Sequence, residues 1–113
     1  MAQWYVEYLA MKIARSEAKS PFAHFLVDSS GQSVIEIYSN PAAEVPVYTD
    51  MSPFTLHFAF LVDDMEGERA RLIAAGATSA GEPVTTPAGD QLAFLRDPWG
   101  VTLQLVKRQV SLL

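Results

Sequence analysis

Two stretches of this chain repeat one another, and the repeat constrains the fold more than any other feature. Phe25-Leu-Val-Asp-Ser-Ser-Gly31 matches Phe94-Leu-Arg-Asp-Pro-Trp-Gly100 at its Phe, Leu, Asp and Gly positions. A strand-like run follows each stretch, 34–38 or 102–106, and a helix-like segment precedes each at a similar distance. The pattern predicts two similar halves, each ordered helix, strand, strand, strand. Chance similarity of two hairpins is the alternative, because strand–turn–strand segments resemble one another.

The first half contains one helix-like stretch and three strand-like runs. The helix is predicted over 3–11, where Trp4, Tyr8 and Met11 share one stripe. The strands are predicted over 11–16, 21–28 and 33–39. A connection with three prolines follows over 41–54, and it is long for a compact domain. Such a length indicates a role, for instance as a rim or lid.

The second half starts with an additional strand, predicted over 55–62. Asp63 is predicted to cap a helix over 64–75, with Glu66 as its capping-box partner and Gly76 as the stop. The remaining strands are predicted over 79–87, 91–96 and 101–107. A type I turn is expected between the last two, because proline and glycine stand at its second and fourth positions.

These boundaries predict one α+β domain over 1–113, which is too small for two independent cores. Module one is assigned to 1–40, the connection to 41–54, module two to 55–108 and an apolar tail to 109–113. Module one lacks a leading strand, so one edge of its sheet is left without a partner strand. We expect that edge to be covered by a second copy in a homodimer, by the tail, or by a segment outside this chain.

Composition excludes several classes of function. The net charge is −5 and the eight basic residues are scattered, which disfavours nucleic-acid or acidic-membrane partners. There is no cysteine, so disulfides, thiolate nucleophiles and Cys-ligated zinc are excluded. No apolar run approaches the length of about 20 residues that spans a bilayer. The first residues do not resemble a secretion signal, so a cytoplasmic protein is expected.

Strand alternation selects three polar residues as site candidates. In the strand over 56–62 the even positions are large and apolar, which leaves His57 on the opposite face. The same argument leaves Glu36 and Gln104 opposite the apolar faces of the two repeated strands, where they occupy equivalent positions. Apolar faces are expected to pack on the helices, so these three side chains should point into the concave surface that the two halves share.

An imidazole, a carboxylate and an amide oxygen that converge would suit a divalent metal, and zinc, nickel, manganese, iron and cobalt all accept such donors. A metal with open positions would polarise adjacent oxygens of a substrate. The alternative is that Glu36 and His57 hydrogen-bond one another or are solvated in an open cleft. No residue is assigned a catalytic role. The cavity is expected to be lined by Tyr38, Ala59, Leu61, Thr102 and Trp99, although an aromatic in a turn, as at Trp99, more often packs on a neighbour.

Several stretches together resemble a known superfamily. They are Leu56-His-Phe-Ala-Phe-Leu-Val-Asp-Asp64, Leu92-Ala-Phe-Leu-Arg-Asp-Pro-Trp-Gly100, Leu103-Gln-Leu-Val106 and Ile35-Glu-Ile-Tyr38. The set is similar to the vicinal oxygen chelate superfamily, which contains glyoxalases, bleomycin-resistance proteins and extradiol dioxygenases. The resemblance covers nearly the whole chain, and it is specific as a set rather than through any single motif.

The resemblance implies paired β-α-β-β-β modules that form an open, barrel-like antiparallel sheet around a cavity. In metal-dependent members the ligands come from the first and last strands of each module. Carried over, Glu36 matches the last strand of module one and His57 the first strand of module two. Gln104 stands where the second module often has Glu, and the fourth position would lie on the strand that module one lacks.

Two functions follow as expectations from the resemblance. One is a divalent-metal-dependent lyase, isomerase or dioxygenase that acts on a small oxygenated substrate. The alternative is a metal-free protein of the bleomycin-resistance type, which binds a small molecule such as a drug or antibiotic. The amide at Gln104 and the missing strand count against the first, because an amide is a weaker ligand than a carboxylate and cannot act as a general base. Fold alone does not choose between them.

Overall fold

The structure is a computed structural model that describes residues 1–112, apart from the side chain of Ser33. The fold is α+β, as predicted. The chain divides into two compact units, Met1–Pro46 and Val47–Leu113, and the division falls inside the predicted connection. The last residue of the predicted tail, Leu113, lies outside the described residues. Within residues 1–112, no helix is long and apolar enough to cross a membrane.

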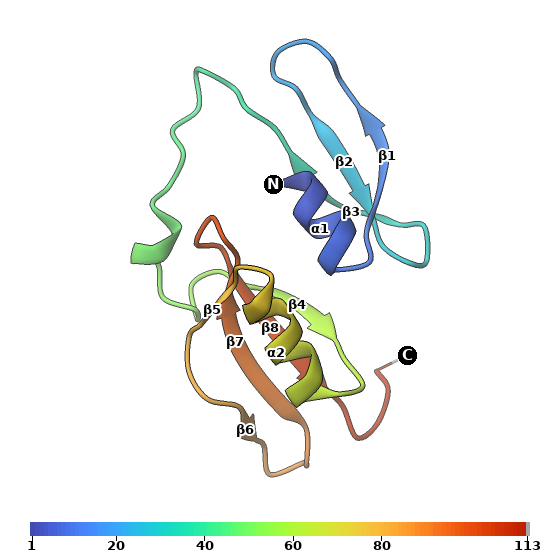
Figure 1. Cartoon of the computed structure of the whole chain (residues 1–113), viewed down its shortest axis with the longest axis vertical. Coiled ribbons are helices and arrows are strands. Elements are labelled where there is room, and N and C mark those ends of the chain that lie inside the picture. Colours follow the sequence, from blue (N-terminus) through green and yellow to red (C-terminus); the bar gives the residue numbers. More distant parts are fainter. Residues whose placement is uncertain (113) are drawn as a thin grey trace. The chain divides into compact units, whose positions relative to one another are not determined.

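Unit 1 is a three-stranded antiparallel sheet with one helix against it (Figure 1). Its elements are α1 (Ala2–Tyr8), β1 (Lys12–Ser16), β2 (His24–Val27) and β3 (Ser33–Ile37), and the strand order is β1-β2-β3. The helix is shorter than the predicted 3–11. Ala10 takes a left-handed φ of 53°, which turns the chain out of the helix and into β1.

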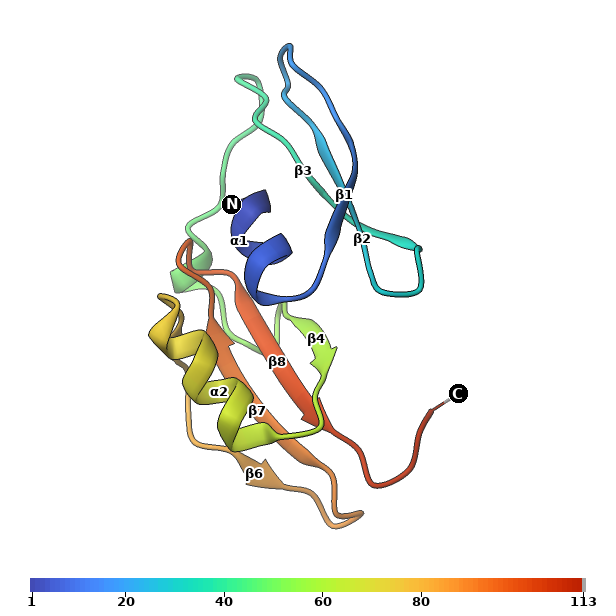
Figure 2. The same ribbon diagram turned by 45° about the vertical axis from the view of Figure 1, so that its right-hand side comes forward.

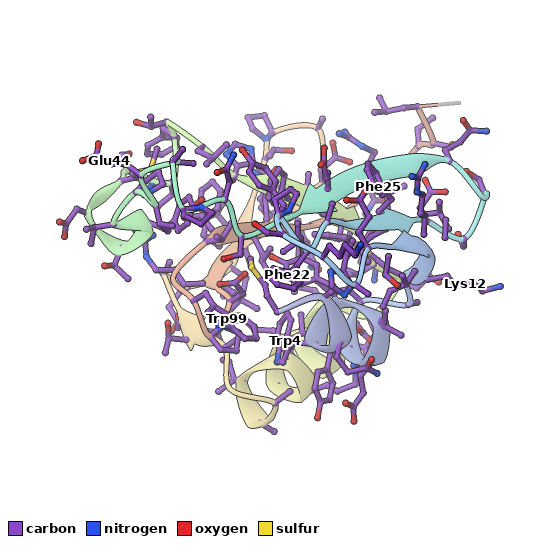
Figure 3. The ribbon with its side chains drawn as sticks, turned by 90° about the horizontal axis from the view of Figure 1, so that it is seen from above. Trp4, Lys12, Phe22, Phe25, Glu44 and Trp99 are labelled. Atoms are coloured by element: carbon purple, nitrogen blue, oxygen red, sulfur yellow. The ribbon has the colours of Figure 1, made fainter. Side chains whose placement is uncertain are left out.

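The two faces of this sheet differ in chemistry. Leu26 is fully buried, and the register sets it beside Ile13 and Ile35 on the face that α1 covers. On the opposite face the register places Phe25 and Glu36 in one row across the strands. Figure 3 shows Phe25 on the strands and Trp4 on α1. The predicted alternation in β3 is therefore confirmed.

Unit 2 has a longer sheet covered by one helix (Figure 2). Its strands run in the order β4-β8-β7-β5, and β6 also pairs with β7. The elements are the 3-10 helix η1 (Tyr48–Asp50), β4 (Phe58–Leu61), α2 (Met65–Ala74), β5 (Thr78–Ser79), β6 (Val84–Thr85), β7 (Gln91–Arg96) and β8 (Thr102–Lys107). The weak strand predicted over 79–87 thus becomes two short strands, and β7 has the predicted bounds. The apolar side chains Leu95, Leu103 and Leu105 are fully buried, and α2 packs on the strands that carry them.

The leading strand of unit 2 pairs differently from the others. β4 runs parallel to β8, with Ala59 opposite Gln104, whereas the other ladders of this sheet are antiparallel. β8 therefore lies between two strands, while β3, its counterpart in the repeat, lies at an edge.

The N-cap of α2 is one residue later than predicted. Asp64, not Asp63, accepts a hydrogen bond from the backbone N–H of Gly67 at 3.1 Å. A capping carboxylate accepts from the backbone N–H of the second or third helical residue, and because α2 begins at Met65, the cap is Asp64. Gly76 follows the helix with φ +107°, so the predicted stop is confirmed.

The two repeated turns share the same hydrogen bonds from backbone N–H groups, and in the first the Ser30 hydroxyl also donates to Oδ1 of Asp28. Oδ1 of Asp28 accepts from the backbone N–H groups of Ser30 and Gln32, at 2.9 and 3.1 Å. Oδ1 of Asp97 accepts from those of Trp99 and Val101, both at 2.9 Å. Each turn also closes with a bond from its glycine N–H to the aspartate carbonyl, at 3.0 and 2.9 Å respectively. The sequence repeat is therefore a repeat of backbone geometry.

Candidate functional site

One row of side chains crosses the sheet of unit 2 on the face away from α2. Gln104 in β8 lies opposite Ala59 in β4 and opposite Phe94 in β7. Residues directly opposite one another on paired strands point to the same side. The neighbours of Gln104 along β8, Leu103 and Leu105, point to the other side and are fully buried. Gln104 and Phe94 are only half-buried, and no described residue hydrogen-bonds the amide of Gln104.

His57 lies one residue before β4, on the same side as Ala59. Its Nδ1 is 2.7 Å from the carbonyl oxygen of Pro53. A carbonyl can only accept, so Nδ1 must carry the proton, and in the neutral ring Nε2 then holds the lone pair. The chain supplies no other hydrogen-bond partner for this ring within residues 1–112. Nε2 is therefore free to accept a proton or to donate its lone pair to a ligand.

Two aromatic rings contact the ring of Phe94 in edge-on geometry. The centre of the His57 ring lies 5.3 Å from that of Phe94, with 66° between the ring planes. The centre of the Phe54 ring lies 5.8 Å from that of Phe94, with 84° between the planes. Phe54 is nevertheless 85% exposed, more than any other large apolar side chain among the described residues. Phe54, His57, Phe94 and Gln104 together are called the aromatic face below. It combines exposed ring surface, one acceptor nitrogen and one unpaired amide.

Sequence reasoning found His57 and Gln104 but not the two phenylalanines. Phe94 could have been found, because it alternates along β7 with Leu95, which is buried. Phe54 stands in the proline-rich connection, where no periodicity indicates which way a side chain points.

The predicted cavity residues of unit 2 have different surroundings. Ala59 and Leu61 are exposed on the same side as His57, Leu61 to 74%. Thr102 is buried, and its Oγ1 accepts a hydrogen bond from Nη1 of Arg96 at 3.1 Å, so its hydroxyl group is already engaged. Trp99 lies in the β7–β8 turn and is about half exposed.

The remaining predicted residues belong to unit 1. Glu36 lies opposite Phe25 in β2, and Phe25 lies opposite Arg15 in β1. The Arg15 guanidinium carbon is 6.0 Å from the centre of the Phe25 ring. Glu36 is exposed and forms no ion pair with the described residues. Tyr38, just beyond β3, is also exposed.

The family of the chain is decided by a match to a family model. Residues 1–105 match the Glyoxalase/Bleomycin resistance protein/Dioxygenase superfamily. The chain belongs to this superfamily. The match confirms the resemblance seen in the sequence and covers both units. No curated protein matches the sequence significantly.

Solved structures of the superfamily share the fold. A glyoxalase family protein from Bacillus cereus is 20% identical, with a TM-score of 0.74, over 90% of this chain and 80% of that one. A superfamily enzyme from Burkholderia phytofirmans PsJN is 18% identical, with a TM-score of 0.71, over 95% and 87%. A glyoxalase I variant from Zea mays is 22% identical, with a TM-score of 0.68, over 95% of this chain and 39% of that one.

Metal-dependent superfamily members need several ligands around one ion, and the donors of unit 2 alone do not supply them. The aromatic face offers one imidazole and one amide, whereas a catalytic zinc site uses three protein ligands. Among residues 1–112, no three His, Cys, Asp or Glu side chains gather in a way that could hold a metal ion.

Proposed function

We propose that the aromatic face binds a small aromatic or amphipathic molecule without a metal. The observation that carries the proposal is the ring of Phe54, which is 85% exposed although it stands edge-on to Phe94 beside His57. Small-molecule sites combine apolar and aromatic walls with a few polar groups that fix orientation. Nε2 of His57 would accept a hydrogen bond from the ligand, and the Gln104 amide would donate one and accept another.

Ligand binding is tested by thermal shift and calorimetry with a panel of aromatic compounds that carry a hydroxyl or amine group. Phe54→Ala should weaken a hit by about tenfold, because burial of an aromatic side chain contributes on the order of 1–3 kcal/mol. Val84→Ala, which also removes an exposed apolar side chain of unit 2, is the matched control and should leave the affinity unchanged. Equal affinity in Phe54→Ala, or hits that all require added metal, would contradict the proposal.

The second candidate is a divalent-metal-dependent lyase, isomerase or dioxygenase acting on a small oxygenated substrate. The bond from Nδ1 of His57 to the Pro53 carbonyl favours it, because metal-ligating histidines commonly donate their other N–H to a carbonyl. Gln104 would be a second ligand. Glu36 is included as a third candidate ligand only because it is the counterpart of Gln104 in the sequence repeat.

Elemental analysis of protein purified without chelator tests the metal-dependent candidate. It predicts stoichiometric zinc, nickel, manganese, iron or cobalt, a thermal shift when that metal is added, and loss of both in His57→Ala and in Glu36→Gln. Metal that persists in Glu36→Gln at full stoichiometry would remove Glu36 from the ligand set.

We also propose that the protein is a homodimer in which a second copy covers the outer edge of β3. This edge strand carries backbone N–H and C=O groups that no strand of unit 1 pairs, and such edges attract other strands. Light scattering should give twice the mass of the chain. A chain cut after Gln109 distinguishes an edge of β3 that the tail covers from one that a second copy covers. A monomer that is equally stable with and without the tail would contradict both.

A further inference from the structure

Arg96 holds the segment 47–51, called the bound segment here, against the β7–β8 turn. Its Nη1 donates to the carbonyl oxygen of Tyr48 at 3.0 Å, and its Nη2 donates to that of Met51 at 2.9 Å. Nη1 also lies 3.0 Å from the Gly100 carbonyl oxygen and 3.1 Å from Thr102 Oγ1, and since it carries two protons, two of its three acceptors share one proton. A single guanidinium therefore bridges two parts of unit 2 that are far apart in sequence.

The chemistry of these bonds favours one geometry. Arginine presents its N–H donors in a planar fork. The two carbonyl groups of the bound segment must therefore lie at fixed positions relative to the guanidinium plane. The acceptors are neutral oxygens. Arg96 is half-buried, and bonds from a charged donor are stronger than bonds between neutral groups. The side chain thus acts as a structural cation rather than as one half of an ion pair.

A second contact holds the same segment. Gly100 has φ +91°, and a β carbon built on it would stand 2.7 Å from Cγ2 of Thr49. The backbone of the turn therefore approaches the bound segment more closely than a residue with a side chain would permit.

The bound segment leads directly to the carbonyl group that orients His57. Pro53 lies two residues after Met51, and the intervening Ser52 begins a turn in which its carbonyl accepts from Thr55 N at 2.9 Å and its Oγ accepts from Phe54 N at 3.2 Å. This short, hydrogen-bonded path leaves little freedom between the anchor at Met51 and the Pro53 carbonyl. The position of that carbonyl decides which nitrogen of His57 carries the proton.

We propose that Arg96 is a positioning residue that fixes the tautomer of His57 through the bound segment. Arg96 holds Met51, Met51 places the Pro53 carbonyl, and that carbonyl keeps the proton on Nδ1 and the lone pair on Nε2. The functional consequence rests on the proposed function, because the fixed tautomer presents Nε2 to the ligand that the aromatic face binds. Its test needs neither ligand nor metal.

The test is nitrogen-15 NMR of the imidazole of His57 in the unliganded chain above the titration range of histidine. The unaltered protein should show a protonated Nδ1 and an unprotonated Nε2. Arg96→Met should lose this pattern and shift toward the Nε2–H form that free imidazoles prefer, and Arg96→Lys should recover it only in part. Arg108→Met removes another arginine of unit 2, which pairs with Asp90, and should leave the His57 signals unchanged. A folded Arg96→Met with the Nδ1–H form intact would overturn the proposal.

A measurement on the unaltered chain decides the case if Arg96→Met does not fold. The Nη protons of Arg96 should give separate, slowly exchanging signals, because both Nη groups are held by carbonyl oxygens. A single averaged signal in rapid exchange with water would overturn the proposal. Ligand titration is run separately, so that failure of the aromatic face to bind a compound is distinguishable from failure of Arg96 to set the tautomer.

Discussion

Unit 1 and unit 2 share one pattern, a helix followed by antiparallel strands, but unit 2 alone has a leading strand, β4. In unit 2 β4 pairs with β8 on the side away from β7, so β8 is an inner strand and most of its residues are buried. In unit 1 the equivalent strand, β3, is at an edge, and both Glu36 within it and Tyr38 just beyond it are exposed. The turns between the paired strands have the same hydrogen bonds from backbone N–H groups in both units. The local geometry is therefore the same, and the added strand accounts for the difference in burial.

The largest expected effect comes from matched truncations in the two equivalent strands. Leu103→Ala in β8 should lower the free energy of unfolding by about 3 kcal/mol, because the side chain is fully buried. Ile35→Ala, at the same repeat position in half-buried β3, should cost roughly 1 kcal/mol. Denaturant unfolding followed by Trp99 and Trp4, one in each unit, measures both. Equal losses would show that β4 gives β8 no advantage over β3.

The two turn aspartates come next. Asp97 is buried with its carboxylate bonded to two backbone N–H groups, so Asp97→Ala should cost about 2 kcal/mol. Asp28→Ala removes the same pair of backbone bonds and also the bond from the Ser30 hydroxyl, but at an exposed turn, so it should cost clearly less, because water replaces the lost partner. Thermal unfolding of the two variants side by side gives the comparison. A larger loss at Asp28 would mean that burial does not set the strength of this turn.

The helices supply a smaller contrast. Asp64 caps α2 with its side chain, whereas α1 has no side-chain cap. Asp64→Ala should reduce stability by about 1 kcal/mol. Asp63→Ala is the matched control and should change it by less than about 0.5 kcal/mol. If Asp63→Ala has the greater effect in denaturant unfolding, the cap lies one residue earlier than the structure places it.

The smallest effect is on pH dependence, and it belongs to unit 1. The hydroxyl of Ser30 and the backbone N–H of Gln32 stabilise the charged form of Asp28 and lower its pKa below the ordinary 3.8. A depressed folded-state pKa contributes stability above the ordinary value, which is lost as the pH falls through the lower folded value. A carbon-13 titration of the Asp28 carboxyl should show the depression, and Ser30→Ala should reduce it. If the pKa of Asp28 is the same in Ser30→Ala, the hydroxyl of Ser30 is not the cause of the depression.

The sequence predicted what depends on local pattern. The bounds of β7, the stop at Gly76, the hairpin turn at Asp97 and the faces of β3 and β8 all follow from residue types and alternation. The parallel pairing of β4 with β8 did not, because alternation shows which side a residue faces but not which strand lies next to it. Arg96 was missed for the same reason: two of its four acceptors, Tyr48 and Met51, lie in the bound segment, which is remote in the sequence.

Of the candidate site, sequence reasoning found the polar part. His57 and Gln104 emerged because a polar residue in an apolar strand is conspicuous, whereas the apolar Phe94 is not. The tautomer of His57 depends on the Pro53 carbonyl, whose position is a matter of loop conformation and leaves no trace in residue spacing.

The parallel ladder between β4 and β8 also leads to an expectation about the order of folding. The strands of unit 1 are joined by short hairpins, so each pairing closes a small loop. Residues 58–61 pair with residues 103–106, and α2, β7 and the β7–β8 turn lie between them in the chain, so this pairing closes a long loop. Closure of a long loop costs entropy before any contact compensates it, so non-local pairs form late. We therefore expect His57 to reach Phe94 late in folding, and a partly folded chain to lack the aromatic face.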